Sequence, residues 1–291
     1  MRVLYLTDGR PPAIAAADLL TAIADPAGIE MTVLHVDEYG NKIVADRVAE
    51  EVLGEAVKYL AQTGVTAAKK RAGGGVKRAI ERELVAEEYE LVAMGAGNTG
   101  SLGQLILGGV STFVLHRSRV PTLAVHRAPI RGRDRVRVIV GTDGSPAASR
   151  AIDTLIALAR PDRCDIFVRS VVEPQLPPRP VPVMPTDPVG APETMLADQN
   201  EDAERVIREA LQRFSNAGFR CDGDVVSGSA EVAVLDVVHD RDADVVVVGT
   251  RGRGRFAAIA LGSVSAHLVR AAPASLVAPD PGTSPDDEVV E

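Results

Sequence analysis

The residues whose types and spacing best suit chemistry are glycines and a serine that follow an apolar run. After the run DVVVV the chain reads Gly249-Thr-Arg-Gly252, and after nine further residues Gly262-Ser263 opens an apolar helical pattern. Glycine tolerates positive φ and lets a backbone approach a ligand closely, which we expect of Gly249 and Gly252. Unpaired N–H groups at a helix start favour phosphate. The spacing therefore predicts a phosphate-binding loop.

Side chains around this loop could complete such a site. Arg251, Arg253 and Arg255 could offset the charge of a triphosphate, and Ser263 adds a hydroxyl. The alternative interpretation is a tight turn followed by an ordinary helix start with a serine N-cap. The full spacing behind a buried strand favours phosphate over that alternative.

The chain consists of two copies of one unit. VLYLTDGRPPAIAAADLL from Val3 and VIVGTDGSPAASRAIDTL from Val138 have the same pattern, in which Thr-Asp-Gly follows an apolar run. Asp8 thus corresponds to Asp143, and further along the chain the alignment pairs Gly95 with Gly249 and Gly108 with Gly262.

The second copy is about 19 residues longer than the first between these motifs. We assign the difference to the stretch Pro174–Pro192, which holds eight of the nineteen prolines of the chain. Such a composition predicts an extended, solvated loop. Because the loop follows the second strand of its copy, we expect it to form a mobile flap near the site.

Each copy alternates strands with helices. Runs such as VVVVG and FVRSVV are almost continuously apolar, which is typical of parallel strands buried on both faces. Helices must then cover both faces, and the pattern predicts an α/β fold with two tandem, open, doubly wound sheets. The expected strands are Val3–Thr7, Glu30–Val36, Thr66–Arg71, Leu91–Met94 and Thr122–Val125, then Arg137–Gly141, Asp165–Val171, Cys221–Val226, Asp244–Val248 and Ser275–Val277.

The motif Gly-2x-Gly-9x-Gly-Ser after a fourth strand, paired with an aspartate at the end of the first strand, resembles the universal stress protein family. The resemblance is to its tandem subclass, with the ATP-binding type in the second domain. It implies five parallel strands in the order 3-2-1-4-5 in each domain. It also implies ATP as the ligand, with Mg²⁺ as an option. The expected domains are 1–128 and 135–280, the second carrying the insertion 174–192, and an acidic tail occupies 281–291.

The resemblance also implies a set of ligand-binding residues in the second copy. Asp143 and the backbone near Val171 would frame adenine and ribose, and Thr142 would add backbone contacts. The remaining members of the set, which would hold ribose and phosphates, are Gly249, Thr250, Gly252, Gly262, Ser263 and Val264.

The first copy departs from the motif twice, with Asn98 in place of the second glycine and Gly109 in place of the serine. Its loop spells a Gly-x-Gly-x-x-Gly pattern, which alone suggests a dinucleotide fold. That fingerprint belongs in the first strand–helix turn, with an acidic residue about 20 positions further on. Here it follows the fourth strand, and no acid ends the next strand, so we reject the nicotinamide interpretation.

A weaker second site remains an alternative in the first copy. It would be built from Asp8, Val36, Gly95 and Gly108. This copy could bind a nucleotide weakly, bind a smaller nucleotide, or bind nothing and serve as a structural partner. The loss of the serine disfavours ordinary ATP binding there.

Composition limits the remaining function classes. The net charge is −8 and the pI is about 5.3, which argues against nucleic acid and anionic membranes as partners. No apolar run reaches the roughly 18–20 residues that span a bilayer, and the N-terminus does not resemble a signal peptide, so we expect a cytoplasmic protein. Two cysteines and five scattered histidines predict no metal site. The stretch 131–137 predicts a linker with surface arginines.

We therefore expect an ATP-binding regulatory protein of the stress-response type. The alternatives are a slow ATPase or phosphotransferase, or a ligand-free interaction protein. Enzymatic activity is not expected, because the chain has no Walker lysine and no evident catalytic base. The two domains should form an intramolecular pseudo-dimer through Thr122–Val125 and Ser275–Val277, and a homodimer is a further option.

Overall fold

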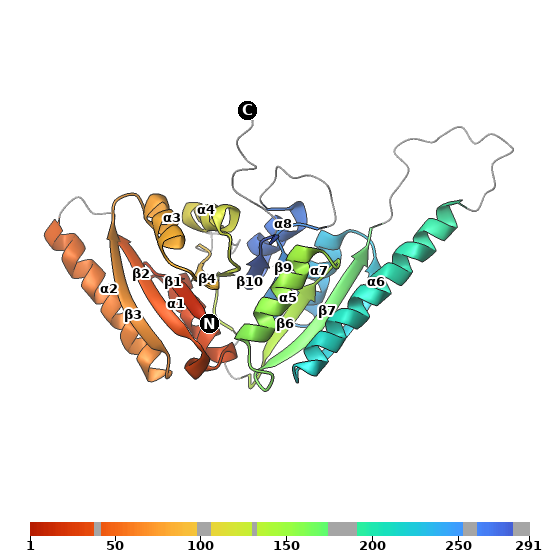
Figure 1. Cartoon of the computed structure of the whole chain (residues 1–291), viewed down its shortest axis with the longest axis horizontal. Coiled ribbons are helices and arrows are strands. Elements are labelled where there is room, and N and C mark those ends of the chain that lie inside the picture. Colours follow the sequence, from red (N-terminus) through yellow and green to blue (C-terminus); the bar gives the residue numbers. More distant parts are fainter. Residues whose placement is uncertain (38–41, 98–105, 130–132, 174–190, 253–260, 282–291) are drawn as a thin grey trace, which may run out of the picture.

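The computed structural model describes residues 1–37, 42–97, 106–129, 133–173, 191–252 and 261–281. In these ranges ten strands form one sheet in the order β3-β2-β1-β4-β5-β10-β9-β6-β7-β8 (Figure 1). The strands are β1 Arg2–Leu6, β2 Glu30–Asp37, β3 Thr66–Gly73, β4 Leu91–Gly95, β5 Thr122–Val125, β6 Val136–Gly141, β7 Cys164–Val172, β8 Arg220–Ser227, β9 Val245–Gly249 and β10 Ala274–Ala278.

Each half of this sheet has the order 3-2-1-4-5 with all its strands parallel, so the predicted α/β fold is confirmed. The halves are not two separate open sheets, however. β5 pairs antiparallel with β10, with Leu123 opposite Leu276, and the two halves join into one sheet. The reason is that each of these short strands would otherwise leave an edge of unpaired backbone groups.

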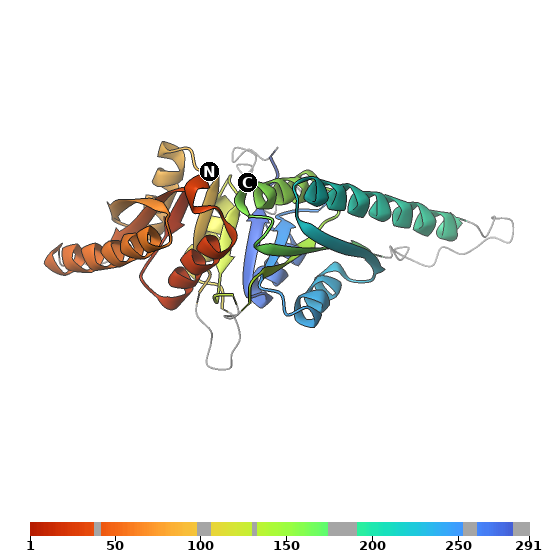
Figure 2. The ribbon, with the colours of Figure 1, turned by 90° about the horizontal axis from the view of Figure 1, so that it is seen from below.

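Helices cover both faces of the sheet, as the continuous apolar strands require. Two cores result, each running through both halves. One face carries α1 Pro11–Ile23, α2 Lys42–Gln62, α5 Pro146–Leu158 and α6 Ala191–Asn216, and the other carries α3 Val76–Ala86, α4 Gly109–Arg117, α7 Ala230–Asp240 and α8 Ser263–Ala271. Figure 2 shows helices above and below the twisted sheet in each half.

The last two residues of the expected insertion lie in a helix. Ala191 and Pro192 begin α6, because a proline in the first turn of a helix loses no hydrogen bond. Residues 174–190 lie outside the described part of the chain, and so does the flap expected there. The expected acidic tail falls outside it as well, apart from Pro281.

The seam between the halves is held by more than the β5–β10 ladder. The ring of His126, at the end of β5, donates from Nε2 to the carbonyl of Val269 in α8, 2.8 Å away. On the other face the ends of α1 and α5 meet, where Arg160 N donates to the carbonyl of Ile23 at 2.7 Å. Both helical faces of the second half are thereby tied to the first half.

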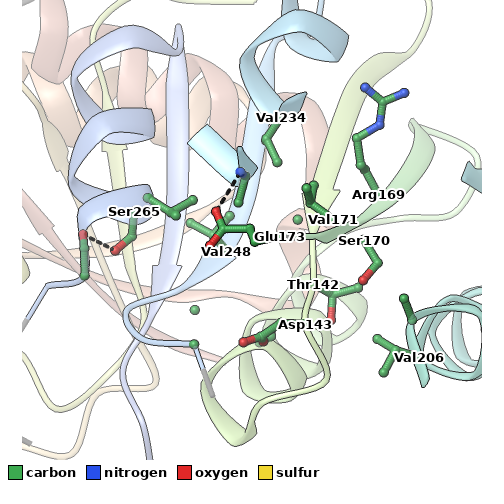
Figure 3. Close-up of a pocket in the computed structure, with 18 of the residues that line it drawn as sticks. Thr142, Asp143, Arg169, Ser170, Val171, Glu173, Val206, Val234, Val248 and Ser265 are labelled. Carbon is green, nitrogen blue, oxygen red and sulfur yellow. Dashed lines mark hydrogen bonds between the residues drawn. The ribbon is translucent and has the colours of Figure 1, made fainter. Parts of the chain in front are cut away.

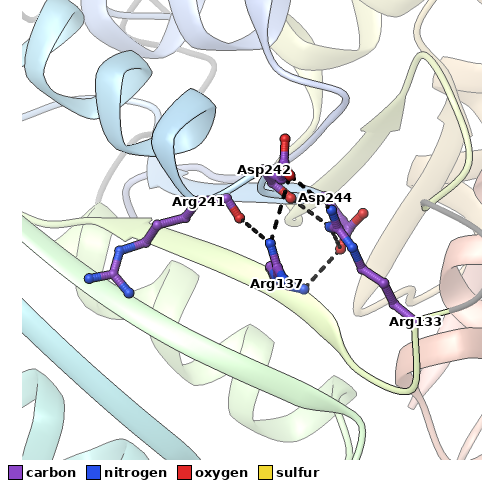
Figure 4. A network of polar contacts seen from close by, with 5 residues as sticks. All are labelled: Arg133, Arg137, Arg241, Asp242 and Asp244. Atoms are coloured by element: carbon purple, nitrogen blue, oxygen red, sulfur yellow. Dashed lines mark hydrogen bonds and ion pairs between the residues drawn. The ribbon is translucent and has the colours of Figure 1, made fainter.

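The arginines after the first half were expected on the surface, and Arg133 and Arg135 lie there partly exposed, with side chains that are 20% and 21% exposed. Arg133 donates to the carbonyl of Asp242 at 2.7 Å (Figure 4). The backbone N–H of Arg137 donates to Asp244 Oδ2 at 2.9 Å. These arginines fasten the chain to the amino-terminal edge of the second half, because backbone carbonyls and carboxylates there need donors.

The seam predicts a pH dependence of stability through His126. Burial lowers the pKa of His126 from its ordinary value of 6.5, and its Nδ1 is buried without a hydrogen-bond partner among the described residues. The ring in the fold therefore takes up a proton at a lower pH than it does in the unfolded chain, where its pKa is about 6.5. Stability is fully present above that pH and falls as the pH decreases below it, by at most about 1.4 kcal/mol per pH unit for one group.

Denaturant unfolding between pH 7.5 and about pH 5 tests this prediction. His126→Gln keeps an N–H donor for Val269 but cannot titrate, so its stability should decline less steeply than that of the wild type. An exposed histidine on the same half, His116→Gln, is the control and should follow the wild type. Equal slopes for wild type and His126→Gln would contradict the assignment.

Candidate functional site

The carboxyl ends of three strands of the second half frame a pocket of about 860 Å³. β6 pairs with β7 on one side and with β9 on the other, so the connections leave β6 in opposite directions. Such a reversal opens a crevice at the carboxyl edge of a parallel sheet. Figure 3 shows Asp143, Val171 and Val248 around this space.

The structure brings all nine residues selected in the second half to this one pocket. They come from three strand ends and one helix start that lie far apart in the sequence. They are Thr142 and Asp143 after β6, Val171 in β7, Gly249, Thr250 and Gly252 after β9, and Gly262, Ser263 and Val264 at the start of α8.

Asp143 is held by the turn that contains it. Gly144 has a φ of +73°, which only glycine adopts readily. The backbone N–H of Ser145 donates to Asp143 Oδ1 at 3.0 Å, and the Ser145 hydroxyl accepts from Ala148 N at 3.2 Å as the N-cap of α5. The same hydroxyl donates to the carbonyl of Arg251 at 3.2 Å. The aspartate turn and the glycine loop are thus joined through one serine.

The glycine loop does not have the backbone conformation that the sequence suggested. Neither Gly249 nor Gly252 has a positive φ. Close approach explains them instead. A Cβ on Gly249 would lie 2.6 Å from Ala148 N, and one on Gly252 would lie 2.7 Å from Asp143 Oδ2. Gly249 therefore permits the contact between β9 and α5, and Gly252 leaves space beside the aspartate.

The start of α8 opens onto the same pocket. Gly262 is its N-cap and makes no side-chain cap, while its N–H donates to the carbonyl of Thr250 at 2.7 Å. Ser265 fixes this arrangement, because its hydroxyl lies 2.9 Å from the same carbonyl. Ser263, the first helical residue, is exposed. Its hydroxyl and the first N–H groups of the helix can therefore receive an anion.

Charged groups elsewhere in the pocket are already engaged. Arg169 clamps Asp224 through two nitrogens at 2.7 and 2.6 Å and also donates to the carbonyl of Ala233. Glu173 accepts from the N–H of Ala230 at 2.9 Å and so occupies the start of α7 (Figure 3). The N-terminus of α8 is therefore the helix start that remains accessible to an anion in the described part of this pocket.

Three further features of the described residues concern metal ligands, long apolar helices and thiols. No group of three or more His, Cys, Asp or Glu side chains that could hold a metal ion occurs among them. Over the same residues, no helix combines the length and apolarity needed to cross a bilayer. Burial raises the pKa of Cys164 to about 12, so this thiol is protonated at neutral pH and packs as an apolar group.

Comparison with known proteins gives a result for the whole chain. The model of the universal stress protein family matches residues 1–126 and 135–278. The chain belongs to the universal stress protein family. It carries two domains of that family, one in each half of the sheet.

Individual relatives agree with this membership. A universal stress protein of Mycolicibacterium smegmatis is 27% identical over 241 residues, which are 82% of this chain and 73% of the relative. One from Mycobacterium tuberculosis is 27% identical over 234 residues, 74% of either chain. Among solved structures, a universal stress protein from Archaeoglobus fulgidus shares the fold with a TM-score of 0.63 and 22% identity, covering 96% of this chain and 98% of its own.

The first universal stress protein domain places three of its four candidate residues at the matching strand ends and the fourth, Gly108, at the matching helix start, but their surroundings differ. Asp8 accepts from the N–H of Arg10 at 3.0 Å and forms an ion pair with that arginine at 3.6 Å. Val36 lies in β2, and Gly108 is the N-cap of α4, whose first residue, Gly109, has no hydroxyl. Gly95 only repeats the packing role of Gly249, since its Cβ would lie 2.6 Å from Ala13 N.

Sequence reasoning missed one wall of the pocket. Four residues of α6 line it at the spacing i, i+3, i+4, i+7, which is one face of a helix. The helical spacing of these residues is visible in the sequence. It does not show that this face of the helix lies beside the carboxyl ends of the strands. The four residues are Gln199, Asp202, Ala203 and Val206.

The crowding at Gly249 predicts a loss of stability in Gly249→Ala. The added methyl would collide with the backbone of α5 rather than with a movable side chain, so we expect a cost of about 1–3 kcal/mol with or without ligand. Gly109→Ala is the matched control, because nothing lies within 4 Å of its Cβ position. Urea denaturation measures both. A stable Gly249→Ala protein would show that the glycine is not needed for packing.

Proposed function

We propose that the second universal stress protein domain binds ATP and that its occupancy regulates the protein. The observation that carries the proposal is the convergence of Asp143, Gly252 and Ser263 on one pocket at the reversal of the sheet. Phosphates would lie at the start of α8, where unpaired N–H groups and the helix dipole favour negative charge. Asp143 would accept hydrogen bonds from ribose hydroxyls, since a carboxylate offers acceptors only.

The charged side chains that line the pocket support an orientation of the nucleotide with its phosphates at the start of α8. Asp202, on α6, places a carboxylate on the side of the pocket formed by β7 and α6, where phosphates would be repelled. Arg251 lies on the opposite side with the glycine loop. Arg253 and Arg255 lie outside the described residues. Mg²⁺ would accompany the phosphates of the nucleotide, because the described protein residues form no metal cluster.

The first domain would not bind ATP in the ordinary way. Gly109 provides no hydroxyl at the start of α4, and Arg10 is already paired with Asp8. We therefore predict about one ATP per chain. Denaturing the purified protein and identifying the released nucleotide, with its molar ratio, is the direct test. Intact ATP would favour regulation, whereas ADP with measurable turnover would favour an ATPase. Two equal sites per chain in calorimetry would contradict the asymmetry.

Gly252→Val should abolish ATP binding while the fold is retained. Its side chain would occupy the space beside Asp143 Oδ2, which lies only 2.7 Å from the Cβ position. Thermal shift provides the measurement, since ATP at 100 times its dissociation constant adds about 2.7 kcal/mol to the stability of a protein that binds it. The wild type should respond and Gly252→Val should not. A wild-type response in the variant would show that this loop does not contact the ligand.

Ser263→Ala should weaken ATP binding by about 1 kcal/mol or slightly more, the typical net contribution of one hydrogen bond. Ser263 is exposed at the first position of α8, so its loss should leave the fold intact. Gly109→Ala, at the matching position of α4, is the control and should bind as the wild type does. Titration calorimetry compares the three proteins, and equal affinities for wild type and Ser263→Ala would remove the hydroxyl from the site.

A further inference from the structure

The pocket extends beyond the proposed phosphate site at the start of α8. The order of the strands shows in which direction it extends. The glycine loop and α8 follow β9, Asp143 follows β6, and the α6 wall lies beside β7. Adjacent strands are about 4.8 Å apart, so β9 and β7 lie roughly 10 Å apart. A nucleotide with phosphates at α8 and ribose at Asp143 therefore directs its base toward β7 and α6.

That end of the pocket suits a flat ring. Val171, Val234 and Val206 line it from β7, α7 and α6, so apolar side chains approach from both faces of the sheet (Figure 3). Such side chains can pack on an aromatic ring, but they do not distinguish one base from another. Discrimination requires a polar group at the edge of the ring.

Gln199 supplies such a group. It lies on the pocket face of α6, and its Oε1 is buried without a hydrogen-bond partner among the described residues. Its polar neighbour on this face, Asp202, already accepts from Arg205 at 3.1 Å. A buried amide oxygen without a hydrogen-bond donor destabilises the fold, and a hydrogen bond from a ligand N–H would remove this penalty.

We propose that Gln199 is the residue that reads the base of the nucleotide, by accepting a hydrogen bond from the exocyclic amine of adenine. This inference rests on the proposed function of the same pocket. Adenine presents an amine next to a ring-nitrogen acceptor, which the two ends of a glutamine amide can pair together. Along the edge that carries N7, a 6-oxo purine presents acceptors at both positions, so the glutamine oxygen would face another oxygen and remain unpaired.

The test compares ATP with inosine triphosphate, which replaces the exocyclic amine with an oxygen. Titration calorimetry on the full chain should give wild type a preference for ATP of about tenfold, the effect of one buried polar group left unpaired. Gln199→Met has a similar length but no polar group, and should lower the ratio toward one. Gln199→Glu keeps the acceptor and should retain the preference for ATP.

Two further observations separate base reading from a structural role. Gln212→Met, on the same helix, changes a glutamine that is exposed and bonds Asn216 at 2.7 Å, and it should keep the wild-type ratio. A merely structural Gln199 would change affinity for both nucleotides equally in Gln199→Met, which would overturn the inference. No preference in the wild type would also overturn it. A wild type that binds neither nucleotide would overturn the proposed function itself.

Discussion

The geometry of the pocket depends on one close contact, between the end of β9 and the first turn of α5. Gly249 has no side chain, so the backbone of Ala147 and Ala148 can lie where a Cβ would stand. This contact fixes the start of α5, and with it Ser145, whose hydroxyl joins the aspartate turn to the carbonyl of Arg251. Asp143 and Gly252 are adjacent as a consequence. The same contact occurs at Gly95 in the first domain, so it belongs to the architecture rather than to the ligand.

The two domains share this frame and differ in the groups placed on it. Where the second domain has Ser145, the first has Arg10, which pairs with Asp8. Where the second has the exposed Ser263, the first has Gly109. Each difference changes charge or hydrogen bonding at the carboxyl edge and leaves the apolar interior unchanged. Two domains with the same packed interior can therefore have carboxyl edges that differ in charge and hydrogen bonding.

The sequence was informative where a pattern reflects a local requirement. Almost continuously apolar runs predicted buried strands, and the repeated Thr-Asp-Gly and the glycine loop predicted two of the strand ends that frame the pocket. It was misleading at Gly249 and Gly252, because a glycine needed for crowding cannot be distinguished in sequence from one needed for positive φ. It was silent on Gln199 and on the fastening of Arg133 to Asp242, since these depend on which distant segments meet. The domain limits 1–128 and 135–280 stay predictions.

The β5–β10 seam has a consequence for how this chain can diverge. In a symmetric assembly of identical chains, every substitution appears on both sides of the interface at once. Here the two sides are encoded separately, so a change such as serine to glycine at the start of α4 leaves α8 untouched. Because the partners are covalently linked, their association is also unimolecular and does not weaken on dilution. The carboxyl edge of one domain can therefore change while that domain continues to supply the strand that completes the other.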